Sequence, residues 1–289
     1  MNETIRARER LRPFVEQARR FRGWQLDAFG PNPLDPREPW DYRSRASELL
    51  ETAESVVDVG TGGGEVFDEV CASFRRRAVA TEPWPVNAPI AAARLRPRGI
   101  GVVHCDSLVL PFRDDAFGLV LNRHEELDPA EVARVLSPGG TILTQQIGRT
   151  WWQELREFFP RMRHFGDLFH RYQDGLRMSG LNIVQATTHD GRAAYRGLGD
   201  VVFILGVAPW TIRDFDPLGR DLRALQRAEA SLSAPGGIVL TESLFLIEAT
   251  KEARRAPSPG LPSRDAKARR GRGRPMGRCR ATCTLRRRG

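Results

Sequence analysis

Glycines gather in the segment "VVDVGTGGGEVF" (56–67), where four of them occur within five positions directly after an apolar run. Glycine adopts positive φ angles and lets a ligand approach the main chain closely. An apolar strand, a glycine-rich turn and a helix in succession bring helix N-terminal amides to a bound ligand. Dinucleotides and S-adenosylmethionine are the two ligand classes that use this arrangement, and the neighbouring residues must distinguish them.

The phosphate-binding motifs fit this loop poorly. Gly60 and Gly62 match the dinucleotide pattern G-x-G-x-x-G, but the third place holds Glu65, whose carboxylate is a poor neighbour for a pyrophosphate. A P-loop would continue with Gly-Lys-Ser or Gly-Lys-Thr, and no such sequence follows. The loop therefore favours a cofactor that carries no phosphate.

Carboxylates follow at the ends of the next two apolar segments. Glu82 ends "RAVATE", where an acid can accept hydrogen bonds from both hydroxyls of a ribose. Asp106 ends "GVVHCD" and either takes an adenine amine, with Ser107 beside it, or caps a turn. Asp58, just before the glycines, organises the loop or faces the amino group of the cofactor.

The segment "NRHEE" (122–126) ends a further apolar run, at the rim where a substrate would lie. His124 has an ordinary pKa suited to a general base, and Glu125 could orient it or hold a cationic substrate. In the alternative interpretation, Asn122 and Arg123 cap the strand end while His124 packs against the following helix.

Polar and aromatic side chains flank the same rim. Gln145 and Gln146 end the fifth predicted strand, and one of them should face the pocket because neighbours alternate across a strand. Trp24, Trp40 and Tyr42 precede the first strand and form either an aromatic lid or part of the core.

Strands and helices alternate through the middle of the chain. The spacing predicts strands at 55–60, 77–82, 101–106, 117–122 and 141–148, and two closing strands at 180–188 and 243–251. Helices are predicted at 10–22, before 50, at 65–74 and 87–96, after Asp128, and through much of 151–178. Asp128 is a natural N-cap and Glu131 completes a capping-box pattern. This rhythm indicates an α/β fold, Rossmann-like, with a parallel sheet and helices on both faces.

Three regions follow from these patterns. Residues 1–50 form an N-terminal helical extension or lid, and residues 51–251 form the cofactor-binding domain, with a cap insertion at about 191–240. The apolar stretch "VVFILGVAPW" in the cap suggests a small, partly hydrophobic acceptor. Residues 252–289 form a basic tail with little apolar periodicity, which we expect to be disordered alone.

Charge is distributed unevenly along the 289 residues. The net charge is +9, from 45 Lys and Arg against 36 Asp and Glu. From residue 251 onward there are 14 basic and 2 acidic residues, so the first 250 residues hold 31 basic and 34 acidic ones, a balance of −3. The N-terminus is too charged for a secretory signal, and the apolar runs are too short to cross a bilayer. We expect a soluble, cytoplasmic protein that does not bind membranes.

No metal site is expected. His164, His170 and His189 lack the spacing of metal ligands, and Cys279 and Cys283 lack the second pair that a zinc site requires.

The ordered series "VVDVGTGGGE", "ATEPW", "CDSLVLPF" and "LVLNRHEELDPAEVARVLSPGGTILTQQIG" resembles class I S-adenosylmethionine-dependent methyltransferases of the methyltransferase-11 type, related to the quinone-biosynthesis methylases. The resemblance runs from about residue 24 to residue 251. It implies a seven-stranded sheet that binds S-adenosylmethionine across the carboxyl ends of its first two strands, with S-adenosylhomocysteine as product. The residues that we expect to contact the cofactor are Asp58, Gly60, Thr61, Gly62, Gly64, Glu82, Pro83, Asp106, Ser107 and Asn122.

Three functions fit this sequence. The first is methyl transfer to a small molecule by in-line displacement, with oxygen, nitrogen and carbon acceptors all open. The second is RNA methylation, in which the basic tail supplies the only nucleic-acid contacts. The third is a cofactor-binding regulatory protein without transferase activity. The mildly acidic body counts against the second, and the tail has no aromatic residue to stack on bases.

Overall fold

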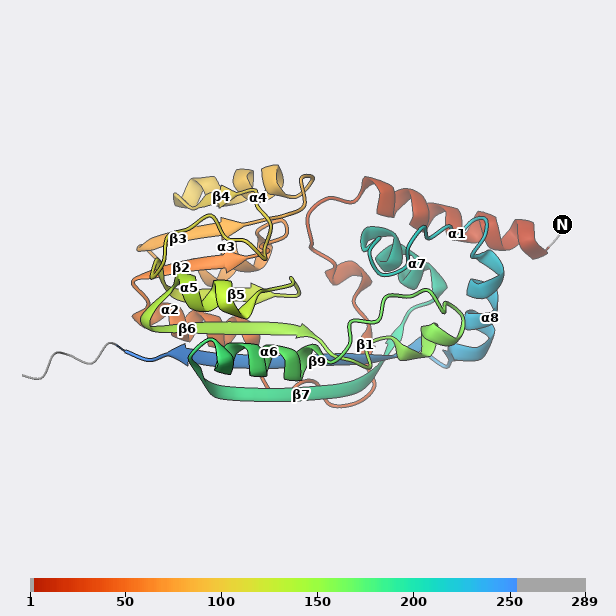
Figure 1. Cartoon of the computed structure of the whole chain (residues 1–289). Helices are drawn as coiled ribbons and strands as arrows, with labels where there is room; N and C mark the ends of the chain where they lie inside the picture. The colour runs from red at the N-terminus through yellow and green to blue at the C-terminus, as the bar shows by residue number, and fades with distance from the viewer. Residues whose placement is uncertain (1–2, 254–289) are drawn as a thin grey trace, which may run out of the picture. The chain divides into compact units, whose positions relative to one another are not determined.

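The computed structural model describes residues 3–253 of the chain. Its centre is a mixed sheet with helices packed on both faces (Figure 1). The predicted α/β fold with a Rossmann-like sheet is therefore confirmed. The prediction of a disordered tail and the two cysteines near the C-terminus, Cys279 and Cys283, lie outside the described residues.

Nine strands make up the sheet in this part of the chain, in the order β1-β7-β9-β6-β5-β2-β3-β4, with β8 paired to β9. The four strand pairs β4-β3, β3-β2, β2-β5 and β5-β6 are parallel. Strand β9 is antiparallel to both of its long neighbours, β6 and β7. The strands are β1 (Asn32–Pro33), β2 (Ser55–Val59), β3 (Arg77–Thr81), β4 (Gly101–Val103), β5 (Phe117–Arg123), β6 (Leu136–Ile147), β7 (Leu181–Tyr195), β8 (Ser233–Ala234) and β9 (Gly237–Lys251).

The expected number of seven strands is too small by two. All seven predicted strands are present, as β2 to β7 and β9. The additional strands, β1 and β8, contain two residues each, and the residues of both are exposed. Strands this short carry no apolar alternation, so the sequence pattern could not reveal them.

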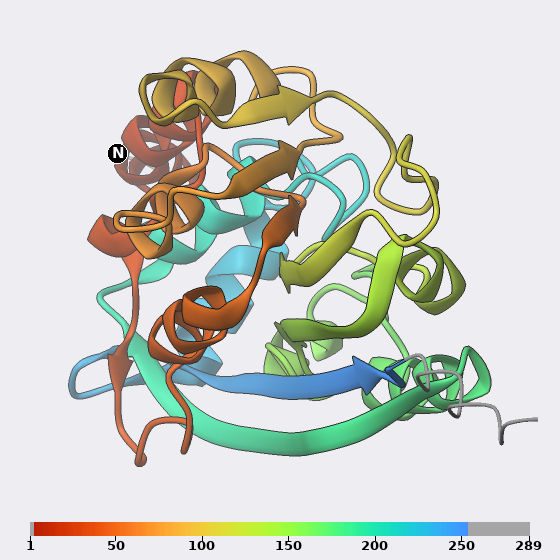
Figure 2. The same ribbon diagram turned by 90° about the vertical axis from the view of Figure 1, so that its left-hand side faces the viewer.

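Helices cover the two faces of the sheet unequally. Helices α2 and α3 lie on one side and α5 and α6 on the other (Figure 2). The helices are α1 (Glu3–Arg20), α2 (Tyr42–Thr52), α3 (Glu65–Val70), α4 (Ala88–Leu95), α5 (Pro129–Val135), α6 (Leu168–Met178), α7 (Leu198–Val207) and α8 (Leu222–Leu232), with short 3-10 helices η1 (Asp27–Phe29), η2 (Arg96–Arg98) and η3 (Gln153–Glu157).

The central strand β2 is buried along its whole length, because helices cover both of its faces. β-Branched residues such as Val56 and Val57 suit this position. The chain proceeds from β2 to β3 and β4 on one side, and then to β5 and β6 on the other. Strand order reverses at β2, and sheets of this kind usually bind ligands in a crevice at the carboxyl ends of the strands that flank the reversal, here β2 and β5.

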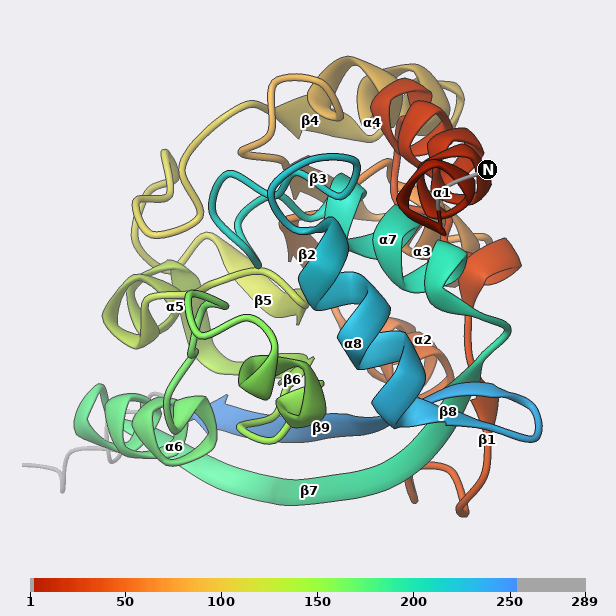
Figure 3. The same cartoon turned by 90° about the vertical axis from the view of Figure 1, so that its right-hand side faces the viewer.

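Two long strands extend into the region that the sequence predicts as a cap, at about 191–240. Both β7 and β9 contain 15 residues, longer than the predicted strands at 180–188 and 243–251. Their additional length extends toward α7 and α8, which lie between them in sequence (Figures 1 and 3). Helix α1 packs there too, and one apolar core joins these elements through Leu11, Val201, Val202, Leu205, Leu225 and Leu240.

The segment from 151 to 178 is less helical than predicted. It contains the short 3-10 helix η3 and then, after an irregular stretch, α6. Pro160 lies in the irregular stretch, and Asp167 caps the start of α6 by accepting a hydrogen bond from His170 N at 3.2 Å. Proline and the cap residue explain why one continuous helix does not form.

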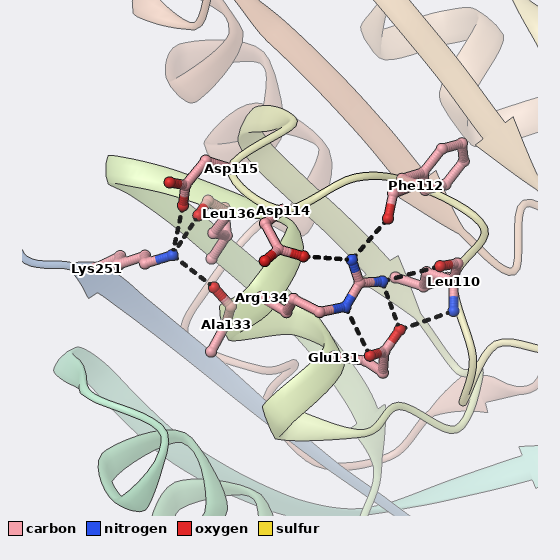
Figure 4. Close-up of polar contacts among 9 residues, drawn as sticks. All are labelled: Leu110, Phe112, Asp114, Asp115, Glu131, Ala133, Arg134, Leu136 and Lys251. Carbon is pink, nitrogen blue, oxygen red and sulfur yellow. Dashed lines mark hydrogen bonds and ion pairs between the residues drawn. The ribbon is translucent and has the colours of Figure 1, made fainter.

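Arg134 on α5 fastens the loop between β4 and β5 (Figure 4). Its guanidinium donates to the carbonyl oxygens of Leu110 and Phe112 at 2.9 and 2.6 Å, and to the carboxylates of Asp114 and Glu131. Glu131 also accepts a hydrogen bond from Leu110 N at 2.9 Å. The expected capping box is thus only half formed, because the Glu131 carboxylate serves this loop instead of the helix start.

The N-cap itself is confirmed. Asp128 Oδ1 accepts hydrogen bonds from Ala130 N and Glu131 N at 2.8 and 3.0 Å. At the other end of α5, Lys251 Nζ donates to the carbonyl oxygens of Ala133 and Leu136 and to Asp115, at 2.7 to 2.8 Å (Figure 4). A cation at a helix C-terminus satisfies its last carbonyls and favours its dipole, so the end of β9 fixes the end of α5.

Candidate functional site

The glycine loop follows β2 at the crevice. Gly60, Gly62 and Gly64 have φ angles of +74°, +64° and +80°, a region that other residues avoid. Thr61 N donates to Thr81 O at 2.8 Å, which fixes the loop against the end of β3. The glycines are therefore required by the backbone of this turn, and α3 begins directly after it.

Glu82 joins the glycine loop to the turn after β3. Its Oε2 accepts a hydrogen bond from Gly62 N at 2.6 Å and its Oε1 accepts one from Trp84 N at 2.9 Å. The residue is only 4% exposed, and burial raises the pKa of Glu82 to about 7. Each carboxylate oxygen retains acceptor capacity after these bonds, which the two hydroxyls of a ribose could use.

Asp58 and Asp106 lie at the ends of β2 and β4 in different environments. Asp58 is buried, and burial raises its pKa to about 6. The Oδ1 of Asp106 accepts a hydrogen bond from Leu108 N at 2.9 Å, so in this structure it caps a turn, which is the second of the two expected roles. Pro83 adds a carbonyl oxygen 3.1 Å from His104 Nε2 on the same side of the sheet.

Two buried hydroxyls in this region lack well-aligned partners. The Oγ1 of Thr61 and the Oγ of Ser107 are shielded from solvent and form no well-aligned hydrogen bond within the described part of the chain. Each nevertheless lies near a carboxylate whose pKa it lowers, Thr61 beside Asp58 and Ser107 beside Glu125, so both hydroxyls can turn either to these acids or to a bound polar group. The residues present therefore fit a polar cofactor such as S-adenosylmethionine, which would offer ribose, amine and carboxylate groups.

Carboxylates crowd the glycines. A Cβ atom added to Gly60 would collide with the Glu125 side chain, and one added to Gly63 would collide with the Glu65 carboxylate. Burial raises the pKa of Glu125 above its ordinary value, as it does for Glu82. Where these acids are ionised, they favour a cationic ligand over a phosphate.

A buried polar cluster holds the turn after β5. Asn122 Nδ2 donates to Val59 O and to Glu125 O, both at 3.1 Å. Gln146 Nε2 donates to Asn122 Oδ1 at 2.5 Å, to Glu125 O at 2.9 Å and to Thr144 Oγ1 at 3.0 Å. Because these donors are already engaged, Gln146 positions the turn, and Gln145 is the member of the pair directed to His124.

His124 itself lies in the turn with a φ angle of +61°. Its N donates to Gln145 O at 2.9 Å, and its Nε2 is 3.5 Å from Gln145 Nε2. The protein packed around the imidazole and the positive charge of Arg123 lower the pKa of His124 below its ordinary range, although part of the residue remains exposed. Glu125 turns to Gly60, so Gln145 rather than Glu125 is beside the imidazole.

The three aromatic candidates occupy different places. Trp40 Nε1 donates to Gln145 Oε1 at 2.8 Å, which brings it beside the rim. Tyr42 is buried in the core between α2 and the sheet. Trp24 N donates to Glu65 Oε1 at 3.3 Å, and a Cβ atom on Gly62 would come within 3.0 Å of Trp24 Cβ.

Two further tryptophans, which the sequence patterns did not assign to the site, form a cluster with Trp24. Trp210 stacks on Trp24 with ring centroids 5.7 Å apart, and Trp84 contacts Trp210 edge-on at 5.8 Å. Trp210 also lines a cavity of about 600 Å³ at the end of α7, with Leu205, Gly206, Pro209, Arg213, Asp214 and Phe215. Both tryptophans follow a proline in the sequence, at 83–84 and 209–210, but this pattern does not predict that the two side chains touch.

Within residues 3–253, no three His, Cys, Asp or Glu side chains are arranged to hold a metal ion. The same residues contain no helix with the length and apolar character needed to cross a membrane.

Fold and crevice together define the class I methyltransferase architecture, and comparison with known proteins agrees. Residues 57–144, from β2 to β6, match the family model described as "Methyltransferase domain". The chain thus contains a methyltransferase domain. A putative methyltransferase from Bacillus halodurans has the same fold, with a TM-score of 0.52 and 18% identity over 73% of this chain and 100% of that one.

Two curated relatives are more specific. The ubiquinone/menaquinone biosynthesis C-methyltransferase UbiE of Cupriavidus metallidurans is 27% identical over 135 residues, 42% of this chain and 54% of the relative. The 23S rRNA (guanine(748)-N(1))-methyltransferase of Streptomyces fradiae is 34% identical over 90 residues, 31% of this chain and 32% of the relative. The chain therefore matches about half of one relative and about a third of the other.

Proposed function

We propose that the protein transfers the methyl group of S-adenosylmethionine to a small-molecule acceptor. The observation that carries this proposal is the Glu82 carboxylate, which joins the glycine loop to the turn after β3 in an acidic crevice without a phosphate site. The cofactor supplies an electrophilic methyl group on a cationic sulfur. Asp58, Thr61, Glu82 and Ser107 would hold its amino-acid and ribose parts.

The chain's own contribution is positioning, and a base where the acceptor must lose a proton. His124 is the candidate base, because it lies at the end of β5 beside Gln145 and its imidazole is neutral at pH 7; the lowered pKa makes it a weaker base than an ordinary histidine. Gln145, fixed by Trp40, lies beside the imidazole and could orient it or the acceptor. Glu125 lies over Gly60, where its carboxylate would favour the cationic cofactor over its neutral product.

The test is a calorimetric titration of the full chain with S-adenosylmethionine, S-adenosylhomocysteine and NAD. We expect the first two to bind at micromolar concentration and NAD not to bind. Glu82→Ala should weaken binding by about 10- to 100-fold, the range for charge-assisted hydrogen bonds. Glu51→Ala, at an exposed position on α2, is the matched control. Preference for NAD, or equal binding by Glu82→Ala, would refute the cofactor assignment.

RNA methylation is the second candidate, supported by the relative that methylates 23S rRNA. Comparing the full chain with residues 1–255 separates the two, because RNA methylation through the basic tail requires that RNA binding and activity disappear together. Cofactor binding without turnover on either substrate class would instead favour a regulatory protein.

A further inference from the structure

Arg123 differs from the other sheltered arginines. Four arginines in residues 3–253 are not exposed: Arg45, Arg123, Arg134 and Arg156. Three of them donate hydrogen bonds: Arg45 to the carboxylates of Glu48 and Glu248, Arg134 to the carboxylates of Asp114 and Glu131 and to two backbone carbonyls, and Arg156 to backbone carbonyls. The guanidinium of Arg123 has neither a hydrogen bond nor an ion pair within the described part of the chain.

The position of Arg123 is the carboxyl end of β5, where it pairs in register with Gln145 on β6. Since side chains alternate across a strand, it shares a face with Leu119 and Leu121, which pack against the α2 side of the sheet. The charges of Arg43, Asp58 and Asp27 act on it, but neither acid reaches ion-pair distance, and the nearby phenol of Tyr42 is neutral because burial raises its pKa. Arg123 therefore lies between the glycine loop and the rim that holds His124.

A sheltered guanidinium without a partner is costly, and proteins normally pair such a group. Its planar fork of N–H donors matches a carboxylate, which it binds through two parallel hydrogen bonds. The other charged groups that line the crevice, Asp58, Glu82 and Glu125, are acids. No described side chain pairs with the partly exposed guanidinium of Arg123, which leaves its N–H donors available to an anionic ligand.

We propose that Arg123 anchors a ligand carboxylate at the end of β5, belonging either to the amino-acid part of the cofactor or to the acceptor. The proposal rests on the proposed methyltransferase function. For the cofactor, Asp58 would face the ammonium group while Arg123 takes the adjacent carboxylate. For the acceptor, the same contact restricts the substrate class to small molecules that carry a carboxylate.

The experiment uses calorimetry on the full-length wild type, Arg123→Met, Arg123→Lys and the control Arg113→Met, which removes an exposed cation. The ligands are S-adenosylhomocysteine, its analogue without the carboxylate, and benzoate titrated in the presence of S-adenosylhomocysteine. Circular dichroism checks that each variant is folded. If Arg123→Met does not fold, Arg123→Lys, which keeps the charge and loses the fork, carries the comparison.

If Arg123 contacts the cofactor, Arg123→Met should bind S-adenosylhomocysteine 10- to 100-fold more weakly than the wild type does, and should bind the analogue without the carboxylate equally well. If Arg123 contacts the acceptor, Arg123→Met and the wild type should bind S-adenosylhomocysteine equally well, and only Arg123→Met should lose benzoate binding. Unchanged affinity for both ligands overturns the proposal. If the wild type binds no S-adenosylhomocysteine, the proposed function fails, and benzoate alone then decides whether Arg123 binds a carboxylate.

Discussion

Replacing Glu82 with glutamine removes a buried titrating group and nearly preserves its shape. The wild-type carboxylate accepts two backbone hydrogen bonds, from Gly62 N and Trp84 N. Glutamine has one acceptor oxygen and one amino group, so one of the two backbone donors loses its partner. That loss costs about 1–3 kcal/mol and does not depend on pH.

The pH-dependent part of the stability difference between Glu82→Gln and the wild type follows from the raised pKa of Glu82. Glu82 has an ordinary pKa of 4.5, and burial raises it to about 7 in the folded protein. Between these values the folded state holds a proton that the unfolded state releases, so the free energy of unfolding falls as pH rises. The stabilisation is fully present below pH 4.5 and is lost as pH passes 7. A difference of about 2.5 in pKa, at about 1.36 kcal/mol for each unit, corresponds to about 3 kcal/mol.

Urea unfolding at pH 4.5 and pH 8 measures this quantity in the wild type, Glu82→Gln and the exposed control Glu51→Gln. We expect Glu82→Gln to be less stable than the wild type at pH 4.5. Its relative stability should increase by about 3 kcal/mol at pH 8, because only the wild type must ionise a buried carboxyl. Parallel pH profiles for the wild type and Glu82→Gln, within about 0.5 kcal/mol, would refute the assignment of a raised pKa.

Three further substitutions test separate parts of the structure. His124→Ala should reduce turnover by about 100-fold or more while cofactor affinity stays within about twofold, and unchanged turnover would exclude a general base. Gly60→Ala combines a positive φ angle with a collision against Glu125, so its free energy of unfolding in urea should fall by more than roughly 2 kcal/mol. Gly99→Ala has the same φ angle but open space around it, so its free energy of unfolding should fall by about 1 kcal/mol. Equal losses would contradict the collision. Asp128→Ala removes the N-cap of α5 and should cost about 1 kcal/mol in thermal unfolding, whereas an unchanged midpoint would mean that the cap contributes nothing.

The sheet was predictable because its information is local. The parallel strands are short apolar runs, several of which end in a glycine or an acid, and the helices α2, α5 and α6 begin at aspartate caps such as Asp128. The lengths of β7 and β9 were not predictable. Their outer halves are partly polar, and only the pairing of Leu181 with Lys251 through to Tyr195 with Ile238 makes them strands.

The site was predictable to the level of segments but not of side-chain directions. The side chains of adjacent residues in the turn after β5 point in different directions: that of Glu125 lies against Gly60, and that of His124 lies beside Gln145. Arg123 was assigned only a possible capping role, because arginine is abundant on the surface of this chain and its type carries little information. The absence of a partner for its guanidinium is a property of the folded protein, which no sequence pattern contains.

The long pairing of β7 with β9 determines how ligands can enter. A cap tethered by loops swings freely, whereas this one is continuous with two hydrogen-bonded strands, and moving it requires those strands to bend or twist together. The connector at 21–41 pairs with the sheet only through the two residues of β1 and is held otherwise by side-chain contacts, such as those of Asp35 with Arg192 and of Trp40 with Gln145. Amide hydrogen exchange should accordingly be slower along β7 and β9 than in this connector, which has fewer backbone hydrogen bonds.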